Sequence, residues 1–154
     1  SLALEYPNAR VIAVDKSLRA LKIAKKNSKV LNLSIDLVNS DWLTGLQFKF
    51  DLIVCNPPYI SSEDYLKLDS SVKDFEPKVA LTPDPLSSCT GYENYHYFEF
   101  NLLSYLNMGG VALFEVGKDM ADNVKSIFIA NKDFKVDVHK DLGGTDRVIS
   151  VLKM

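Results

Sequence analysis

Phe50-Asp51-Leu52-Ile53-Val54-Cys55-Asn56-Pro57-Pro58-Tyr59 is the stretch that decides the fold of this 154-residue chain. Its apolar run predicts a strand that is buried on both faces, as in a parallel sheet. Pro57 has no N–H and disfavours a helical conformation at Asn56, so the strand must end there. Asn56 is therefore a polar side chain at the carboxyl end of a buried strand. In open α/β sheets, ligands bind at such ends.

The residues that follow this strand offer two hydrogen-bond acceptors. Asn56 carries a side-chain carbonyl, and a backbone carbonyl beside a proline has no helix or ladder partner to claim it. Two such acceptors can hold both hydrogens of an NH2 group, and the ring of Tyr59 can lie against its flat face. On the residues alone, Asn-Pro-Pro can equally be a turn without chemical role. With the tyrosine, the pattern predicts binding of a planar amino nitrogen whose lone pair faces an electrophile.

An earlier strand, residues 10–15, is apolar until it ends at Asp15. An acidic residue in that position commonly binds both hydroxyls of a ribose in nucleotide-binding α/β folds. The alternative is that Asp15 caps the helix predicted over residues 17–32. Ser17 is a better-placed cap, which favours the ribose role for Asp15.

A short strand over residues 35–38 is followed by Asp41 and Trp42. Asp41 could accept a hydrogen bond from the exocyclic amine of adenine, with Trp42 as a flat apolar wall. Both could instead be structural, as a turn cap and a core side chain. Asp15, the Asp41-Trp42 pair and Asn56 follow three successive strands, whose ends are expected side by side in a doubly wound sheet. This coincidence supports a binding site more strongly than any one residue.

Several motifs in the chain resemble those of the HemK/PrmC family, the N5-glutamine methyltransferases of peptide chain release factors. Asn-Pro-Pro-Tyr alone resembles S-adenosylmethionine-dependent amino-methyltransferases in general. The flanking motifs narrow the resemblance to HemK/PrmC and extend it over most of the chain. They are Ser40-Asp41-Trp42, Phe75-Glu76-Pro77-Lys78-Val79-Ala80-Leu81 and Asp141-Leu142-Gly143-Gly144-Thr145-Asp146-Arg147-Val148.

The resemblance implies an α/β fold with the Rossmann-like sheet of class I methyltransferases, mostly parallel with a C-terminal antiparallel strand pair. It also implies S-adenosylmethionine as cofactor and a release factor as protein substrate. The substrate amide would be bound by Asn56, Pro57, Pro58 and Tyr59, of which Asn56, Pro57 and Tyr59 would be catalytic. The cofactor would be bound by Asp15, Asp41, Trp42 and Asn56. No metal site is expected.

In the family, a first strand and a glycine-rich turn precede these elements and hold the methionine part of the cofactor. No Gly-x-Gly occurs before residue 15. We therefore interpret residues 1–154 as an N-terminally truncated methyltransferase catalytic domain. The missing turn also leaves a second alternative, a non-catalytic fragment or interaction module.

Net charge is −2, with 47% hydrophobic and 25% charged residues, which is typical of a globular protein. The slightly acidic balance favours a protein substrate over nucleic acid. An N6-adenine or other nucleic-acid amino-methyltransferase stays as the first alternative, because adenine N6 presents the same NH2 group. Two cysteines indicate a reducing compartment, and no run approaches a membrane span. We expect a cytoplasmic protein, or an organellar matrix protein if eukaryotic.

The rest of the chain is predicted from periodicity and turn residues. Residues 60–90 form a long loop with short helical turns near 63–69 and 71–75, which we interpret as the wall of the substrate site. An aromatic-rich helix spans 91–106, and Gly109-Gly110 is predicted to turn the chain into a strand over 111–116. A helix over 118–130 precedes strands at 134–139 and 147–152.

Overall fold

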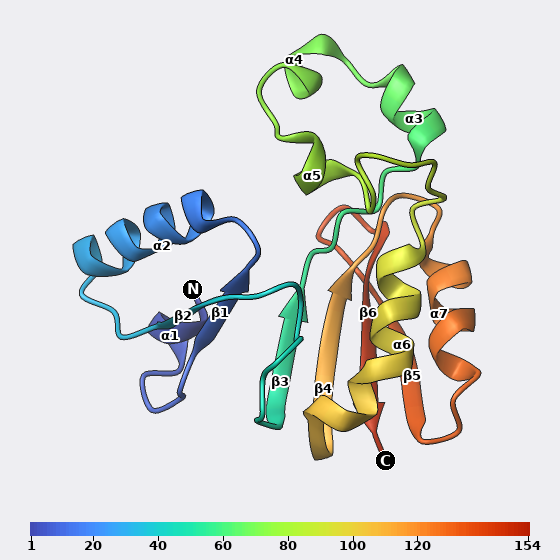
Figure 1. The fold of residues 1–154 in the computed structure, drawn as a ribbon. Helices are drawn as coiled ribbons and strands as arrows, with labels where there is room; N and C mark the ends of the chain where they lie inside the picture. Colours follow the sequence, from blue (N-terminus) through green and yellow to red (C-terminus); the bar gives the residue numbers. More distant parts are fainter. The chain divides into compact units, whose positions relative to one another are not determined.

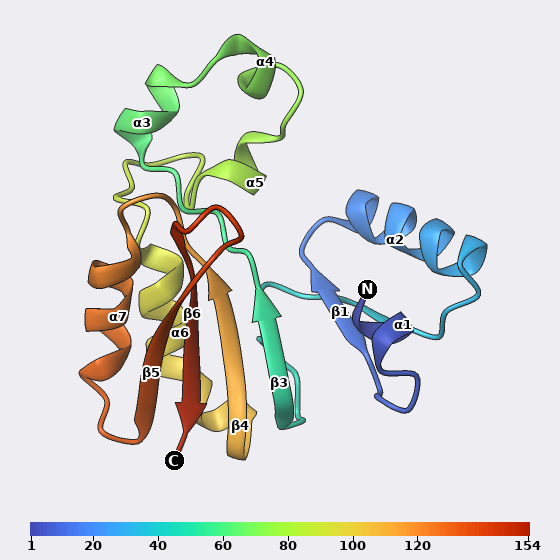
Figure 2. The same ribbon diagram turned by 180° about the vertical axis from the view of Figure 1, so that it is seen from behind.

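The computed structural model describes residues 1–154, which divide into two compact units, residues 1–48 and residues 49–154. Figures 1 and 2 show the elements of each unit. None of the helices combines the length and the apolar character that crossing a bilayer requires.

The first unit holds two parallel strands and a helix between them. Its elements are α1 (Leu2–Glu5), β1 (Ile12–Asp15), α2 (Leu18–Val30) and β2 (Asp36–Asn39). Asp15 at the end of β1 is directly opposite Asn39 at the end of β2. Helix α2 begins after Ser17, whose hydroxyl accepts a hydrogen bond from the Ala20 N–H at 3.2 Å. The predicted strands, helix and N-cap of this unit are confirmed.

The second unit is built on a four-stranded sheet of order β3-β4-β6-β5. Its strands are β3 (Phe50–Cys55), β4 (Leu106–Glu115), β5 (Phe134–Lys140) and β6 (Asp146–Lys153). β3 and β4 are parallel, whereas β6 pairs antiparallel with both β4 and β5. The α/β architecture and the predicted antiparallel pair at the C-terminus are confirmed.

Two long helices of the second unit, α6 (Glu93–Tyr105) and α7 (Ala121–Ile129), lie on the same face of the sheet, as the two views show (Figures 1 and 2). Three short helices fill the segment after β3: α3 (Ser62–Lys67), α4 (Ser70–Lys73) and α5 (Lys78–Leu81). The first two coincide with the predicted helical turns. The third was not predicted.

The prediction that the strand over 50–55 is buried on both faces is wrong. Ile53 is buried, but Leu52 and Val54 are 42% and 55% exposed. Neighbouring side chains of a strand point to opposite faces, and β3 is the edge strand of its sheet. Ile53 therefore faces the helices, while Leu52 and Val54 project from the opposite face.

The prediction that Gly109-Gly110 turns the chain into a strand is also wrong, because β4 begins at Leu106 and runs through both glycines. The extra residues form an irregularity in the pairing: Phe50 is opposite Leu106, yet Leu52 is opposite Val111. Gly109 has φ +75°, a conformation that suits glycine at a bulge.

The core of the second unit is a cluster of aromatic rings around Phe114 of β4. Its ring stacks on that of Phe128 at 5.1 Å between centroids and lies 4.9 Å from that of Phe98. The Tyr95 ring meets it edge-on at 6.4 Å. All four side chains are fully buried. The cluster therefore fixes α6 and α7 on the sheet.

Replacing Phe114 by alanine should destabilise the protein strongly. The change removes a fully buried ring and leaves a cavity that three neighbouring rings cannot fill, a loss of about 3–5 kcal/mol. Phe100→Ala on α6 is the control, because it removes the same ring from a side chain that is 84% exposed, and it should shift stability by less than about 0.5 kcal/mol. Chemical denaturation of both variants measures the difference, and equal values would contradict the assigned core.

Candidate functional site

The Asn56–Tyr59 turn follows β3 directly. Asn56 is exposed at the carboxyl end of the strand, and its side-chain amide makes no hydrogen bond within the protein. Pro57 is buried, and no N–H or O–H of the protein donates to its carbonyl oxygen. Two neighbouring acceptors of this turn are therefore left for an external donor.

The carbonyls of the next two residues are occupied or enclosed. Asn94 Nδ2 donates a hydrogen bond to the Pro58 oxygen at 2.8 Å. The Tyr59 carbonyl lies against Gly91, where an added Cβ would come within 2.3 Å of its oxygen. Gly91 also has φ +94°. Only glycine permits this approach of the two backbones.

The Tyr59 ring is held by the loop that follows β4. A Cβ on Gly117 would lie 3.0 Å from two carbon atoms of that ring and 2.7 Å from the Met120 sulfur. The ring therefore packs directly against the Gly117 backbone, and a side chain at residue 117 would displace it.

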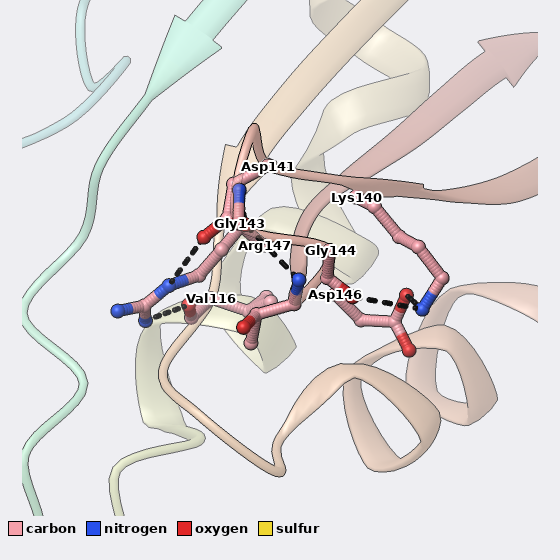
Figure 3. Close-up of polar contacts among 8 residues, drawn as sticks. Val116, Lys140, Asp141, Gly143, Gly144, Asp146 and Arg147 are labelled. Atoms are coloured by element: carbon pink, nitrogen blue, oxygen red, sulfur yellow. Dashed lines mark hydrogen bonds and ion pairs between the residues drawn. The ribbon is translucent and has the colours of Figure 1, made fainter.

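Val116, the residue before Gly117, is in turn positioned by the hairpin between β5 and β6 (Figure 3). Arg147 Nη1 donates to the Val116 oxygen at 3.0 Å, and the Val116 N–H donates to the Arg147 oxygen at 3.0 Å. The Arg147 Nε lies 3.7 Å from Asp141 Oδ2. The 141–148 motif thus forms a turn that clamps the residue before Gly117.

Asp141 organises this hairpin from within. Its Oδ1 accepts hydrogen bonds from the N–H groups of Gly143 and Thr145 at 2.8 and 3.0 Å. Lys140 Nζ forms an ion pair with Asp146 at 2.9 Å across the same turn (Figure 3). An aspartate that binds backbone N–H groups of a tight turn is a common way to fix its conformation.

Glu93 fixes the loop that carries Gly91. Its carboxylate accepts hydrogen bonds from the Thr90 N–H at 2.6 Å and the Gly91 N–H at 3.0 Å. Burial opposes ionisation of Glu93, but these hydrogen bonds outweigh it and lower its pKa. The carboxylate is therefore charged near neutral pH and holds the loop at the start of α6.

Two ionisable groups near the turn stay protonated at neutral pH. Burial raises the pKa of Cys55 to about 12. Burial also raises the pKa of Tyr95, whose hydroxyl donates to the Glu115 oxygen at 2.8 Å. Since a thiolate or phenolate is needed for proton abstraction or nucleophilic attack, neither group is suited to such a role. The structure contains no cluster of three His, Cys, Asp or Glu side chains that could hold a metal ion.

In the first unit, the structure shows the capping arrangement weighed for Asp15 from the sequence, and the ribose role stays a prediction. One carboxylate oxygen, Oδ1, accepts a hydrogen bond from the Ser17 N–H at 2.7 Å, so Asp15 does support the start of α2. Asp15 is nevertheless exposed at the strand end. Asn39, opposite it on β2, donates from Nδ2 to the carbonyls of Asp15 and Lys16, both at 2.9 Å. This side chain joins the two strand ends.

Asp41 and Trp42 lie in the turn that follows β2. Asp41 is exposed, and its backbone oxygen accepts a hydrogen bond from the Thr44 N–H at 3.2 Å. Trp42 is half-buried with φ +51°, a left-handed conformation that is costly for a residue with a large side chain. Such backbone strain is often found at ligand-binding sites.

The structure thus groups the sequence-predicted residues at strand ends within each unit. Asp15, Asp41 and Trp42 follow β1 and β2, and the Asn56–Tyr59 turn follows β3. That these ends lie side by side stays a prediction. Sequence reasoning missed the residues that hold the site: Asn39, Gly91, Asn94 and Gly117. Their partners are distant in sequence, so no local pattern reveals them. The one available hint is that residue 91 is a glycine, the residue type that most readily adopts the positive φ found there.

The close approach at Gly91 predicts a large effect of a single methyl group. Gly91→Ala should destabilise the protein by several kcal/mol more than Gly144→Ala. Both residues have φ near +90°, so both variants incur about 1 kcal/mol of backbone strain, but only at Gly91 does the added Cβ meet a backbone oxygen. Denaturation of both variants measures the difference, and similar losses would show that the 91 loop is not packed on Tyr59.

The family model described as "Methyltransferase small domain" matches residues 1–70. The chain is 36% identical over 155 residues to the bifunctional methyltransferase of Rickettsia prowazekii. The aligned region is 98% of this chain and 29% of that protein. It is 36% identical over 148 residues to the release factor glutamine methyltransferase of Francisella tularensis, with 95% of the chain and 50% of that protein aligned.

Among solved structures, a methyltransferase from Pyrococcus furiosus matches with a TM-score of 0.70 at 17% identity, covering 99% of the chain and 66% of that structure. At this identity the match supports the fold alone. The chain therefore has the α/β fold of class I methyltransferases and spans about half, or less, of the length of the curated relatives it matches.

Proposed function

We propose a function on the premise that this chain is a homologue of the release factor glutamine methyltransferases, the HemK/PrmC family. The chain would transfer a methyl group from S-adenosylmethionine to the side-chain amide nitrogen of a glutamine in a release factor. Residues 1–154 would be part of the catalytic domain of a cytoplasmic enzyme. The observation that carries the proposal is the pair of unpaired acceptors, the Asn56 amide and the Pro57 carbonyl, on a turn whose next carbonyl is already bonded.

The residues of the first unit suit the adenosine part of the cofactor. Asp15 is an exposed carboxylate at the end of a parallel strand, with one oxygen bonded to the Ser17 N–H and the other available to ribose hydroxyls. Asp41 offers a second exposed acceptor for an exocyclic amine, and Trp42 an apolar wall. When bound, S-adenosylmethionine supplies an electrophilic methyl group on a sulfonium sulfur.

The turn after β3 solves the problem that an amide nitrogen is a poor nucleophile. Asn56 Oδ1 and the Pro57 oxygen accept hydrogen bonds from the two N–H groups and thereby aim the nitrogen lone pair at the methyl carbon. The Tyr59 ring packs on the amide plane and excludes water. With S-adenosylmethionine bound, the turn would hold the amide nitrogen for attack on the methyl group, S-adenosylhomocysteine would leave, and the methylated amide would release one proton to solvent.

This mechanism relies on position rather than on a general base. Holding two reactants in near-attack geometry lowers a barrier by roughly 7–11 kcal/mol. That is consistent with the protonated state of Cys55 and Tyr95 close to the turn. The substrate-binding turn needs rigidity, and the contacts of Gly91, Asn94 and Gly117 provide it.

Asn56→Ala should abolish methyl transfer and leave the fold intact, because Asn56 is exposed and bonded to no other residue. We expect a loss of roughly 10²-fold or more in kcat, typical of losing one precisely placed hydrogen-bonding group in an active site. Transfer of labelled methyl to a release factor measures it. Asn27→Ala, at an exposed position of α2, is the control. An active Asn56→Ala enzyme would show that the assignment is wrong.

Tyr59→Phe should retain substantial activity, whereas Tyr59→Ala should lose most of it. The Tyr59 hydroxyl has no hydrogen-bond partner in the protein, and the ring is the part that packs on Gly117. Steady-state rates of the two variants on the same release factor separate stacking from hydroxyl chemistry. If Tyr59→Phe falls as far as Tyr59→Ala, the hydroxyl rather than the ring carries the role.

The substrate class is tested by direct competition. The full-length protein, S-adenosylmethionine with a labelled methyl group, a release factor and an adenine-containing oligonucleotide are incubated together, and the label is located by mass spectrometry. Label on a glutamine side chain supports the proposal. Label on adenine N6 would instead establish the nucleic-acid alternative, and no label on either would refute methyl transfer to both.

A further inference from the structure

We infer that Asn94 is a positioning residue of the proposed reaction. By binding the Pro58 carbonyl, it leaves the Pro57 carbonyl as the acceptor that the substrate amide must use. This inference rests on the proposed function, since it concerns how the Asn56–Tyr59 turn selects one orientation of an NH2 group. It assigns a role to a helix residue that is 36 positions away from the turn it controls.

The contact itself is short and enclosed. Asn94 Nδ2 lies 2.8 Å from the Pro58 oxygen, and Asn94 is only 7% exposed. A buried amide hydrogen bond of this length is retained, because breaking it would leave both a donor and an acceptor unsatisfied at a cost of about 1–3 kcal/mol. The Pro58 carbonyl therefore already has a donor within the protein, whereas the Pro57 carbonyl has none.

Asn94 cannot swing away from this position, because the residues on both sides of it are fixed. Glu93 binds the N–H groups of Thr90 and Gly91, which holds the start of α6. Tyr95 is fully buried and its hydroxyl donates to the Glu115 oxygen at 2.8 Å. The first turn of α6 thus bridges the carboxyl ends of β3 and β4, with Asn94 pointing at the former.

The need for such a residue follows from the chemistry of two successive prolines. Pro57 and Pro58 end the strand and lie in no helix, so no backbone N–H donates to either carbonyl oxygen. With both carbonyls open, a substrate NH2 group would have two ways to bind, and in the second its lone pair would be aimed elsewhere. By donating to the Pro58 carbonyl, Asn94 disfavours this second orientation of the substrate NH2 group.

The test replaces the donor without changing side-chain size. Asn94→Asp and Asn94→Leu both keep the shape of asparagine but donate no hydrogen bond to Pro58. Asn101→Asp and Asn101→Leu are the matched controls, since Asn101 lies on the same helix and also donates to a backbone carbonyl, that of Tyr97, at 2.7 Å. All variants are made in the full-length protein and assayed for kcat and KM on a release factor.

We expect kcat of both Asn94 variants to fall about tenfold, the size of one hydrogen bond's net contribution, with KM for the release factor lowered as well. An unproductive binding mode gives this pattern, because substrate still binds but a smaller share is oriented for reaction. The Asn101 variants should keep both constants. Thermal unfolding of each variant shows which of them are folded, and either Asn94 variant suffices.

Three results would overturn the inference: a raised KM, an unchanged kcat in a folded Asn94 variant, or equal losses in the Asn94 and Asn101 variants. Each would mean that Asn94 only supports the fold. Failure of the proposed function looks different, since the unmodified protein would then transfer no methyl group to glutamine. An active unmodified enzyme with fully active Asn94 variants rejects the role of Asn94 alone.

Discussion

The absence of an N–H group on two successive residues, Pro57 and Pro58, is the constraint on which the second unit depends. It ends the pairing of β3 with β4, and the carbonyl oxygens of both prolines then lie outside any strand or helix and receive no backbone N–H. The protein satisfies one of them through Asn94 and encloses the next against Gly91. It leaves the first open beside the Asn56 side chain. The geometry of the candidate site therefore depends on which of these carbonyl oxygens has a partner within the protein and which does not.

The surrounding elements hold the Asn56–Tyr59 turn and its partners in place. The aromatic core around Phe114 holds α6 on the sheet, and α6 carries Asn94. Arg147 also clamps Val116 (Figure 3), the residue before Gly117, whose backbone packs against the Tyr59 ring. Three segments distant in sequence thus converge on four residues. The 141–148 motif thus supports the turn indirectly, through Val116 and Gly117.

Much of this could be predicted from local sequence signals. Pro57 marks the end of β3, Ser17 marks the start of α2, and alternation marks the final strand pair; each depends on near neighbours in the chain. The buried face of β3 could not be predicted, because Leu52 and Ile53 look alike in sequence and only the sheet decides which one meets a helix. The Gly109-Gly110 pair looks like a turn but lies within β4, where strand pairing overrides its local preference.

The supporting residues of the site were beyond sequence reasoning for the same reason. Asn94 and Asn39 act through partners that are 36 and 24 positions away, and an asparagine has no pattern that reveals such a partner. The two roles weighed for Asp15 were not exclusive, since a carboxylate has two oxygens and the helix uses one. Sequence reasoning therefore located the strand ends but not what holds them.

The two ends of the segment between β3 and α6 are joined to each other by hydrogen bonds. The Ser62 N–H donates to the Cys89 oxygen at 3.0 Å, and the Cys89 N–H donates to the Ser62 hydroxyl at 2.9 Å. Because these bonds close the excursion at its base, the chain between them can lengthen or shorten at a small entropic cost without pulling on the Asn56–Tyr59 turn. The length of this arm can therefore vary between relatives while the Asn56–Tyr59 turn keeps its geometry.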